Sequence, residues 1–218
     1  MRRLAVIAAA GVVVVLLIVA QLLLPRIAAQ RLRDRLSRSG DVLHVEVHAF
    51  PAIELLWHHA DRVVIRLAEY RAPAGDLGSQ LAQAGDVGTL DAQAARVNSG
   101  LLTLHDASLR KRGNELTGMA TVSTQELRAA VPFLDDLRPV ASAAGQLTLR
   151  GTASLFGITG SVDATVAADG GRLIVRPDVP LGALATVTLF DSPHVEIQSV
   201  SARPDVSGFS VSAAGRLR

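Results

Sequence analysis

Residues 40–70 read GDVLHVEVHAFPAIELLWHHADRVVIRLAEY, and this stretch decides the fold class. In its first part apolar residues alternate with polar ones, which is the pattern of a strand with one buried face. A second strand is predicted from Asp61 to Tyr70. Two half-buried strands in succession indicate a sheet that is packed on one side. The predicted inner face of the first strand consists of Leu43, Val45, Val47 and Ala49.

The segment between these two strands is unusually apolar. It holds the pair Phe50-Pro51 and the single tryptophan, Trp57, although aromatic residues are only 3% of the chain. Proline has no N–H to donate to a sheet, so Pro51 is expected to end the strand. Two interpretations remain open: the segment is ordinary core, or it lines a lipid groove, since tryptophan favours membrane interfaces. The groove candidates are Phe50, Pro51, Ile53, Leu55, Leu56 and Trp57.

The remaining sequence predicts a domain built mainly from short strands. An amphipathic helix is expected over 26–39, and Ser123 and Glu126 have the spacing of a capping box at the start of another helix. The glycine-rich stretch 71–88 predicts a long loop or a short mobile helix. Together these features predict an α+β fold, with an antiparallel meander curled over one or two helices in a single domain, 26–218. Further strands are expected at 89–97, 101–109, 116–122, 146–155, 159–167, 172–175, 194–202 and 208–214.

A run of 21 residues from Leu4 to Leu24 contains one polar residue, Gln21. As a helix rising about 1.5 Å per residue, this run would span a hydrocarbon core of about 30 Å. Residues 1–25 are therefore predicted to form an uncleaved N-terminal transmembrane anchor. The alternative is a cleaved signal peptide, whose apolar core is usually shorter, about 7–15 residues. The anchor residues include Leu4, Val12, Leu16 and Leu24.

The charge distribution argues against nucleic acid as a partner. Residues 26–38 hold five arginines and one aspartate, a local charge of +4, whereas residues 39–218 carry about −4. The main domain therefore lacks the basic face that nucleic-acid binding needs. Arg26, Arg31 and Arg33 are candidates for contact with anionic lipid headgroups, and a solvated helix face is the alternative. Counting positive charges alone would keep the C-terminal part in the cytoplasm.

No set of side chains predicts catalysis or a metal site. The chain has no cysteine, which excludes disulfides, thiolate metal sites and a cysteine nucleophile. His44 and His48 are four residues apart in a predicted strand, about 13 Å, which is too far to share an ion. The adjacent Asp135 and Asp136 are expected in a solvated turn. The sequence predicts a non-enzymatic protein with no cofactor and no metal.

The order of these features resembles a known family. The apolar run leads into RIAAQRLRDRLSR (26–38), and a strand then ends in Phe-Pro, VLHVEVHAFP (42–51). Later come QLTLRGTASLFGITGSVDATVAADGGRLIVRP (146–177) and a terminal hairpin, IQSVSARPDVSGFSVSAAGRL (197–217). Over most of residues 20–218 this pattern resembles the LmeA family of phospholipid-binding proteins of the actinobacterial cell envelope.

The resemblance implies an exported protein, anchored in the cell membrane with its domain on the extracytoplasmic (periplasmic) side, and a sheet that wraps a helix as in tubular lipid-binding domains. It also implies phospholipid binding and support of envelope glycolipid (lipomannan-type) assembly, and Phe50 and Pro51 match the family's turn. The leading hypothesis is a module that holds an acyl chain in an apolar groove. The alternatives are an envelope scaffold that binds a protein partner without lipid, and an enzyme acting on lipid-linked sugar.

Overall fold

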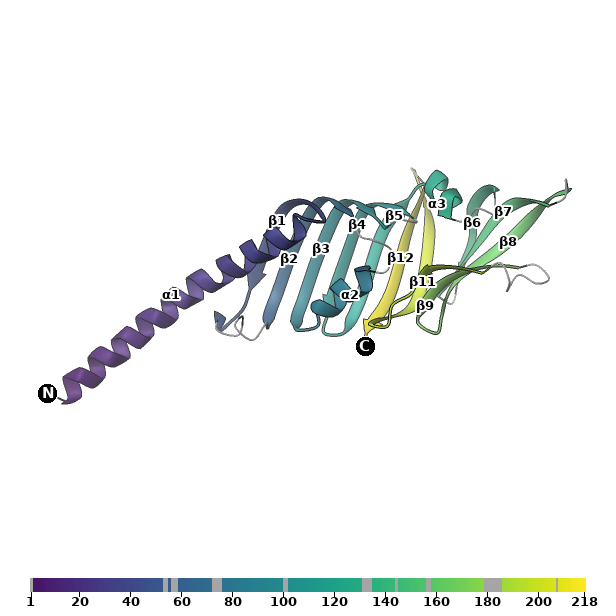
Figure 1. Ribbon diagram of the computed structural model, residues 1–218. Coiled ribbons are helices and arrows are strands. Elements are labelled where there is room, and N and C mark those ends of the chain that lie inside the picture. The colour runs from purple at the N-terminus through teal and green to yellow at the C-terminus, as the bar shows by residue number, and fades with distance from the viewer. Residues whose placement is uncertain are drawn as a thin grey trace.

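The computed structural model describes residues 2–52, 55, 59–71, 76–99, 102–130, 135–143, 145–155, 158–178, 186–206 and 208–218, with side chains in the first helix described from Val19 onward. The chain is mostly β, with one long and two short helices (Figure 1). The helices are α1 (Arg2–Leu36), α2 (Asp76–Gln83) and α3 (Thr124–Ala130). The strands are β1 (Gly40–His48), β2 (Ala60–Arg71), β3 (Val87–Asn98), β4 (Thr103–Arg112), β5 (Glu115–Val122), β6 (Asp135–Ala143), β7 (Gln146–Leu155), β8 (Ile158–Asp169), β9 (Arg172–Pro177), β10 (Val187–Phe190), β11 (Val195–Asp205) and β12 (Gly208–Leu217).

The strands form two sheets. The larger sheet has seven strands in the order β1-β2-β3-β4-β5-β12-β11, and the smaller one has five in the order β10-β9-β8-β7-β6. Neighbouring strands are antiparallel except β2 and β3, which are parallel because the connection through α2 returns the chain to its starting end. After β5 the chain leaves to build the whole smaller sheet, and it returns as β11 and β12, where β12 pairs with β5.

The expectation of one curled antiparallel meander wrapped on helices is therefore wrong. The structure has two separate sheets, and neither is curled around a helix. The physical reason lies in the long segment between β5 and β11. Its strands, β6 to β10, pair with one another and not with the strands of the first sheet. The individual predicted strands are confirmed, and so is a short helix within the glycine-rich stretch 71–88.

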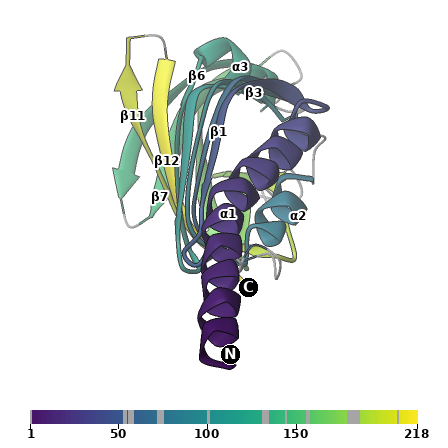
Figure 2. The ribbon, with the colours of Figure 1, turned by 90° about the vertical axis from the view of Figure 1, so that its left-hand side faces the viewer.

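Helices α1 and α2 cover one face of the seven-stranded sheet, which we call the inner face (Figure 2). The C-terminal part of α1 places Ala28, Ala29 and Leu32 against a buried cluster on β1, β2 and β3. This contact confirms the apolar stripe that was predicted within 26–39, although α1 runs without a break through Pro25. From α2, Leu81 packs against a cluster formed by Leu116, Val195 and Leu217.

The five-stranded sheet packs against the inner face at the β11–β12 end. Its core residues, including Leu149, Ala164 and Val175, form one cluster with Val200 and Ala202 of β11. Two turns of this sheet also reach the free edge of β11. The backbone N–H of Val200 donates to the carbonyl of Gly145, and that of Ile197 donates to the carbonyl of Gly171, both at 2.9 Å. These bonds satisfy edge groups that would otherwise be open to pairing with another strand.

Strand β1 departs from simple alternation. Its register against β2 shifts between Asp41 and His44, so Val42 is 7% exposed while Leu43 is 60% exposed. The prediction that Leu43 lies on the inner face is wrong, because a shift of one residue moves a side chain to the opposite face of a sheet. Beyond the shift the prediction is confirmed: Val47 and Ala49 are buried.

The capping box at the start of α3 is confirmed. The backbone N–H and the hydroxyl of Ser123 lie 3.1 and 2.9 Å from Glu126 Oε2, and the N–H of Glu126 donates back to Ser123 Oγ at 3.2 Å. His105 Nε2 lies 3.0 Å from the other carboxylate oxygen. Burial acts to raise the pKa of Glu126, but the hydrogen bonds from Ser123 and His105 outweigh it and lower the pKa below 4.5.

Glu126→Gln should therefore reduce the acid sensitivity of folding. A carboxylate with a lowered folded-state pKa stabilises above its unfolded pKa, and this contribution is lost as pH falls through the folded value. Near pH 7 the variant should be less stable by about 1 kcal/mol, and the difference should shrink on acidification below about pH 4. Urea unfolding of the full chain in detergent micelles measures this. The exposed Glu115→Gln is the control, and an equal pH dependence of wild type and Glu126→Gln would refute the assignment.

Candidate functional site

The residues of the apolar segment after β1 have different surroundings in the structure. Phe50 is 79% exposed, Pro51 is exposed, and the bond between them is cis. The N–H of Phe50 donates to Asp61 Oδ2 at 2.7 Å, which ties the turn to the start of β2. Leu55 instead packs on the inner face, against the cluster that α1 covers. Of the other groove candidates, Ile53, Leu56 and Trp57 lie outside the described residues.

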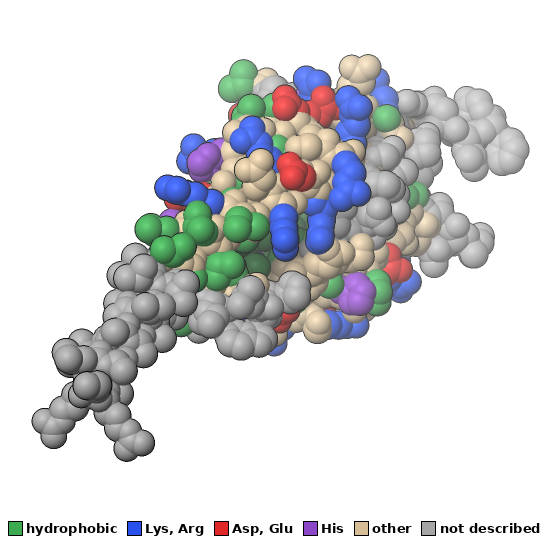
Figure 3. All heavy atoms as spheres, turned by 60° about the vertical axis from the view of Figure 1, so that its left-hand side comes forward, with side chains coloured by type: hydrophobic (Ala, Val, Ile, Leu, Met, Phe, Trp, Pro, Cys, Tyr) green, Lys and Arg blue, Asp and Glu red, His purple; other side chains and the backbone are tan. Residues whose placement is uncertain are grey.

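This turn is joined to α1. The N–H of Ala52, a residue that is 1% exposed, donates to Gln21 Oε1 at 2.8 Å. Gln21 is the only polar residue of the apolar run, so its amide oxygen has a specific partner on the domain. Next to Gln21, the side chains of Leu22, Leu23 and Ile27 are largely exposed. Figure 3 shows hydrophobic side chains gathered where the N-terminal helix meets the rest of the molecule.

The predicted headgroup arginines have different surroundings. Arg26 and Arg31 are exposed, and Arg33 donates to the carbonyl of Val42 at 3.3 Å. Among residues whose side chains are described, no helix is long and apolar enough to cross a membrane. Most of the predicted anchor, including Leu4, Val12 and Leu16, lies outside that part of the chain, and Leu24 is half-buried.

The middle strands of the inner face carry several alanine and glycine residues between larger side chains such as Leu109 and Leu116. The register places Ala94 opposite Ala107, Gly118 opposite Ala213, and Ala120 opposite Val211. Most of these residues remain partly exposed, so neither helix fully covers them. A methyl group added at Gly118 would meet only the carbonyl oxygen of Ser108 within 4 Å, at 3.9 Å. We call this area the small-residue surface, and it consists of Ala92, Ala94, Ala107, Gly118, Ala120 and Ala213.

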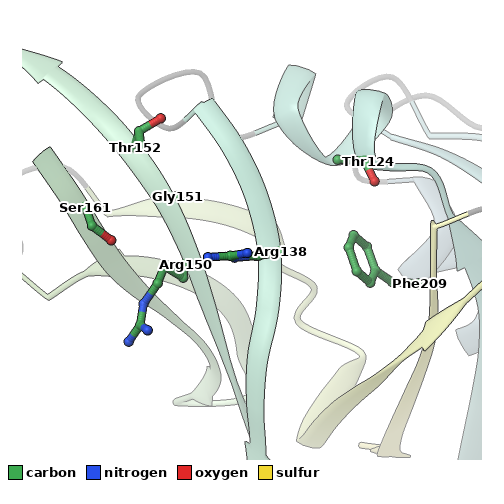
Figure 4. Close-up of a pocket in the computed structure, with 7 residues that line it drawn as sticks. All are labelled: Thr124, Arg138, Arg150, Gly151, Thr152, Ser161 and Phe209. Carbon is green, nitrogen blue, oxygen red and sulfur yellow. The ribbon is translucent and has the colours of Figure 1, made fainter. Parts of the chain in front are cut away.

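A hollow of about 520 Å³ lies beside this surface, where α3, β6, β7, β8 and β12 meet (Figure 4). Phe209, which is 9% exposed, pairs with Val122 on the inner face, two residues along from the Val211–Ala120 pair. Phe209 therefore links the hollow to the inner face, and Val211, which packs against the core of the five-stranded sheet, lies between Phe209 and the small-residue surface. The lining residues are Thr124, Arg138, Arg150, Gly151, Thr152, Ser161 and Phe209.

The two arginines of the hollow differ in their charge partners. Arg150 forms a two-pronged ion pair with Asp163, with N–O distances of 2.7 and 2.8 Å. The hydrogen bond from Arg150 lowers the pKa of Asp163, and Asp163 in turn raises the pKa of Arg150. Arg138 is exposed and has no ion pair among the described side chains. Sequence patterns did not single out this hollow, because its residues come from five separate elements.

The titratable groups singled out in the sequence have partners of their own. His44 and His48 both lie beside Glu46, at 3.6 and 2.9 Å. Asp135 and Asp136 begin β6, so the predicted turn is wrong for their backbone, and their side chains are not described. The single lysine, Lys111, is 1% exposed; its Nζ donates to the carbonyls of Gly85 and Val87 after α2. Within the described residues, no group of three or more histidine, aspartate or glutamate side chains could hold a metal ion.

Comparison with known proteins places the chain in a family. A family model described as LmeA-like phospholipid-binding matches residues 16–209, which is most of the chain. The comparisons with curated proteins and with solved structures find no match. The family assignment therefore confirms the resemblance drawn from the sequence.

Gln21→Leu should release the turn from α1. The buried N–H of Ala52 would lose its acceptor, and an unsatisfied buried N–H costs about 1–3 kcal/mol. Hydrogen–deuterium exchange at Ala52, measured on the full chain in detergent micelles, should speed up about tenfold or more. Gln30→Leu, at an exposed position on the same helix, is the control. Unchanged protection of Ala52 would show that the Gln21 contact does not hold the turn.

Proposed function

Because this chain belongs to the LmeA-like phospholipid-binding family, we propose that it is a non-enzymatic phospholipid-binding protein of the cell envelope. It holds lipid acyl chains in an apolar groove. The bound lipid supports the assembly or maintenance of envelope lipids and glycolipids of the lipomannan type. The family description supports phospholipid as the ligand, and the rest of the proposal goes beyond that description.

The observation that carries the proposal is the small-residue surface. Small residues follow one another across neighbouring strands, with Ala94 opposite Ala107 and Gly118 opposite Ala213, and a methyl group added at Gly118 would meet only one atom within 4 Å. An acyl chain placed there would remove its own methylene groups from water, at about 0.8 kcal/mol per CH₂. The binding free energy would come from the apolar area removed from water and not from polar contacts. Such a site therefore needs no catalytic or metal-binding residues.

The groove candidates of the apolar segment have separate roles in this proposal. Leu55, with its half-buried side chain, borders the groove at the α1 end. Phe50 and Pro51 face outward beside α1 and enter the membrane interface. Ile53, Leu56 and Trp57 remain candidates for the groove rim. Aromatic side chains are favoured at the headgroup level of a bilayer, which suits an exposed phenylalanine next to an apolar helix.

We further propose that residues 1–25 anchor the protein in the cell membrane and that residues 26–218 form one extracytoplasmic lipid-binding domain. Two features support this arrangement. The helix continues from the apolar run into the domain with no linker, and the Gln21–Ala52 hydrogen bond joins the two parts. Arg26 and Arg31 follow the apolar run, are exposed, and would contact anionic headgroups at about 1 kcal/mol each.

Native mass spectrometry with lipid extraction tests the proposal on the full chain released from membranes in mild detergent. Wild type should carry a phospholipid at near-stoichiometric occupancy. Gly118→Trp should lower that occupancy at least several-fold, because its indole would occupy the open space over β5. Aromatic residues are well tolerated in strands, so the fold should survive.

Thr117→Trp is the matched control, since Thr117 is the exposed neighbour on the opposite face of β5. It should retain the wild-type occupancy. A folded, lipid-free wild type that also ignores added phospholipid would favour the alternative, a scaffold that binds a protein partner without lipid. Equal phospholipid occupancy in Gly118→Trp and Thr117→Trp would show that the lipid does not bind on the small-residue surface.

A further inference from the structure

We propose that the hollow between α3, β6, β7, β8 and β12 binds a phosphate-bearing anion, with Arg138 as its main cationic contact. The ligand chemistry is a phosphate mono- or diester, supplied by a lipid headgroup or by free phosphate. The lipid source rests on the proposed function, whereas the anion site itself does not. The site is distinct from the arginines of α1, which adjoin the apolar run.

The first argument is an unbalanced pair of charges. Arg138 of β6 lies directly opposite Arg150 of β7 in the sheet register. Like charges directly opposite one another in a sheet are unfavourable. Asp163, opposite Arg150 on the other side, neutralises Arg150 through its two-pronged ion pair. Arg138 has no such partner among the described side chains. An anion bound beside Arg138 would therefore neutralise its positive charge.

The second argument is the shape and chemistry of the lining. In Figure 4 the guanidinium of Arg138 extends from β6 toward β7, while the end of Arg150 turns away from it. Thr124, Thr152 and Ser161 add three hydroxyl groups to the lining of the hollow, which also includes the buried Gly151 of β7. A planar guanidinium matches the oxygens of a phosphate group, and the hydroxyl groups of the lining are further hydrogen-bond donors for such an anion. The volume of about 520 Å³ is large enough for a headgroup.

The third argument is position. Phe209 lines the hollow and also belongs to the inner face, where its strand carries Val211 and Ala213 toward the small-residue surface. Phe209 is thus the residue at which the hollow meets the inner face. An amphipathic anion bound in the hollow would have its phosphate at Arg138, on the β7 side of β6, and its apolar part near Phe209. We therefore expect the hollow to bind phospholipids with a net negative headgroup more tightly than lipids whose headgroup has no net negative charge.

The test compares Arg138→Gln with wild type and with Arg172→Gln, an exposed arginine of the same sheet. Two probes are used on the full chain in detergent micelles: inorganic phosphate by calorimetric titration, and phosphatidylglycerol by native mass spectrometry. Arg138→Gln should weaken binding about tenfold, and Arg172→Gln should not. Arg138→Lys should recover part of the loss, because it restores charge without the planar fork.

The outcomes separate the two ligand sources. Loss of phosphatidylglycerol occupancy in Arg138→Gln, with or without measurable phosphate binding by wild type, supports a headgroup site. Loss of phosphate affinity with unchanged lipid occupancy supports a free-phosphate site. Binding of both probes equal to wild type in a folded Arg138→Gln overturns the proposal. If wild type holds no lipid, the proposed function fails, and the phosphate titration alone decides the anion site. In that case, absence of phosphate binding by wild type also overturns the proposal.

Discussion

The structure depends on the need to cover the apolar inner face of a seven-stranded sheet. Such a face is stable in water only where another element removes it from solvent. The C-terminal part of α1 covers it at β1 and β2, α2 covers one end of the middle strands, and the five-stranded sheet covers β11 and β12. The middle strands meet this constraint in part with small residues: between larger side chains such as Leu109 and Leu116 they carry alanine and glycine, which expose little apolar area.

Under the proposed function, this division would let one site serve both parts of a phospholipid. The small-residue surface offers contact area without polar groups, and the hollow offers Arg138 and three hydroxyl groups. The two areas are linked because β12 returns to pair with β5, which brings Phe209 beside α3 and β6. The proposed anchor would add a third element, since α1 joins the apolar run to the sheet as one helix and Gln21 accepts a hydrogen bond from the neighbouring turn. A lipid leaving the bilayer beside Phe50 would meet the domain at the α1 end of the groove.

Local patterns in the sequence predicted local structure well. The capping box of Ser123 and Glu126, the strands of the late meander and the terminal hairpin were all evident from spacing, because each depends on neighbours within a few residues. The bulge at Leu43 was missed, since its cause is the register against β2 and not the β1 sequence. The two-sheet topology was missed for a similar reason: no local signal tells that β12 pairs with β5 as well as with β11, so that strands β6 to β10 form a sheet of their own. The small-residue surface and the Arg138 hollow are products of that long-range pairing, so they emerged only from the structure.

The most direct test of the central claim is photo-crosslinking with a phosphatidylglycerol that carries a diazirine in one acyl chain. The full chain in membranes would be irradiated and its adducts mapped by mass spectrometry. The account predicts adducts on the inner-face residues of β3, β4 and β5, with Ala107, Gly118 and Ala120 among them. Adducts confined to α1 and the Phe50 turn would contradict it, because they would show a protein that sits on lipid without holding an acyl chain in its groove.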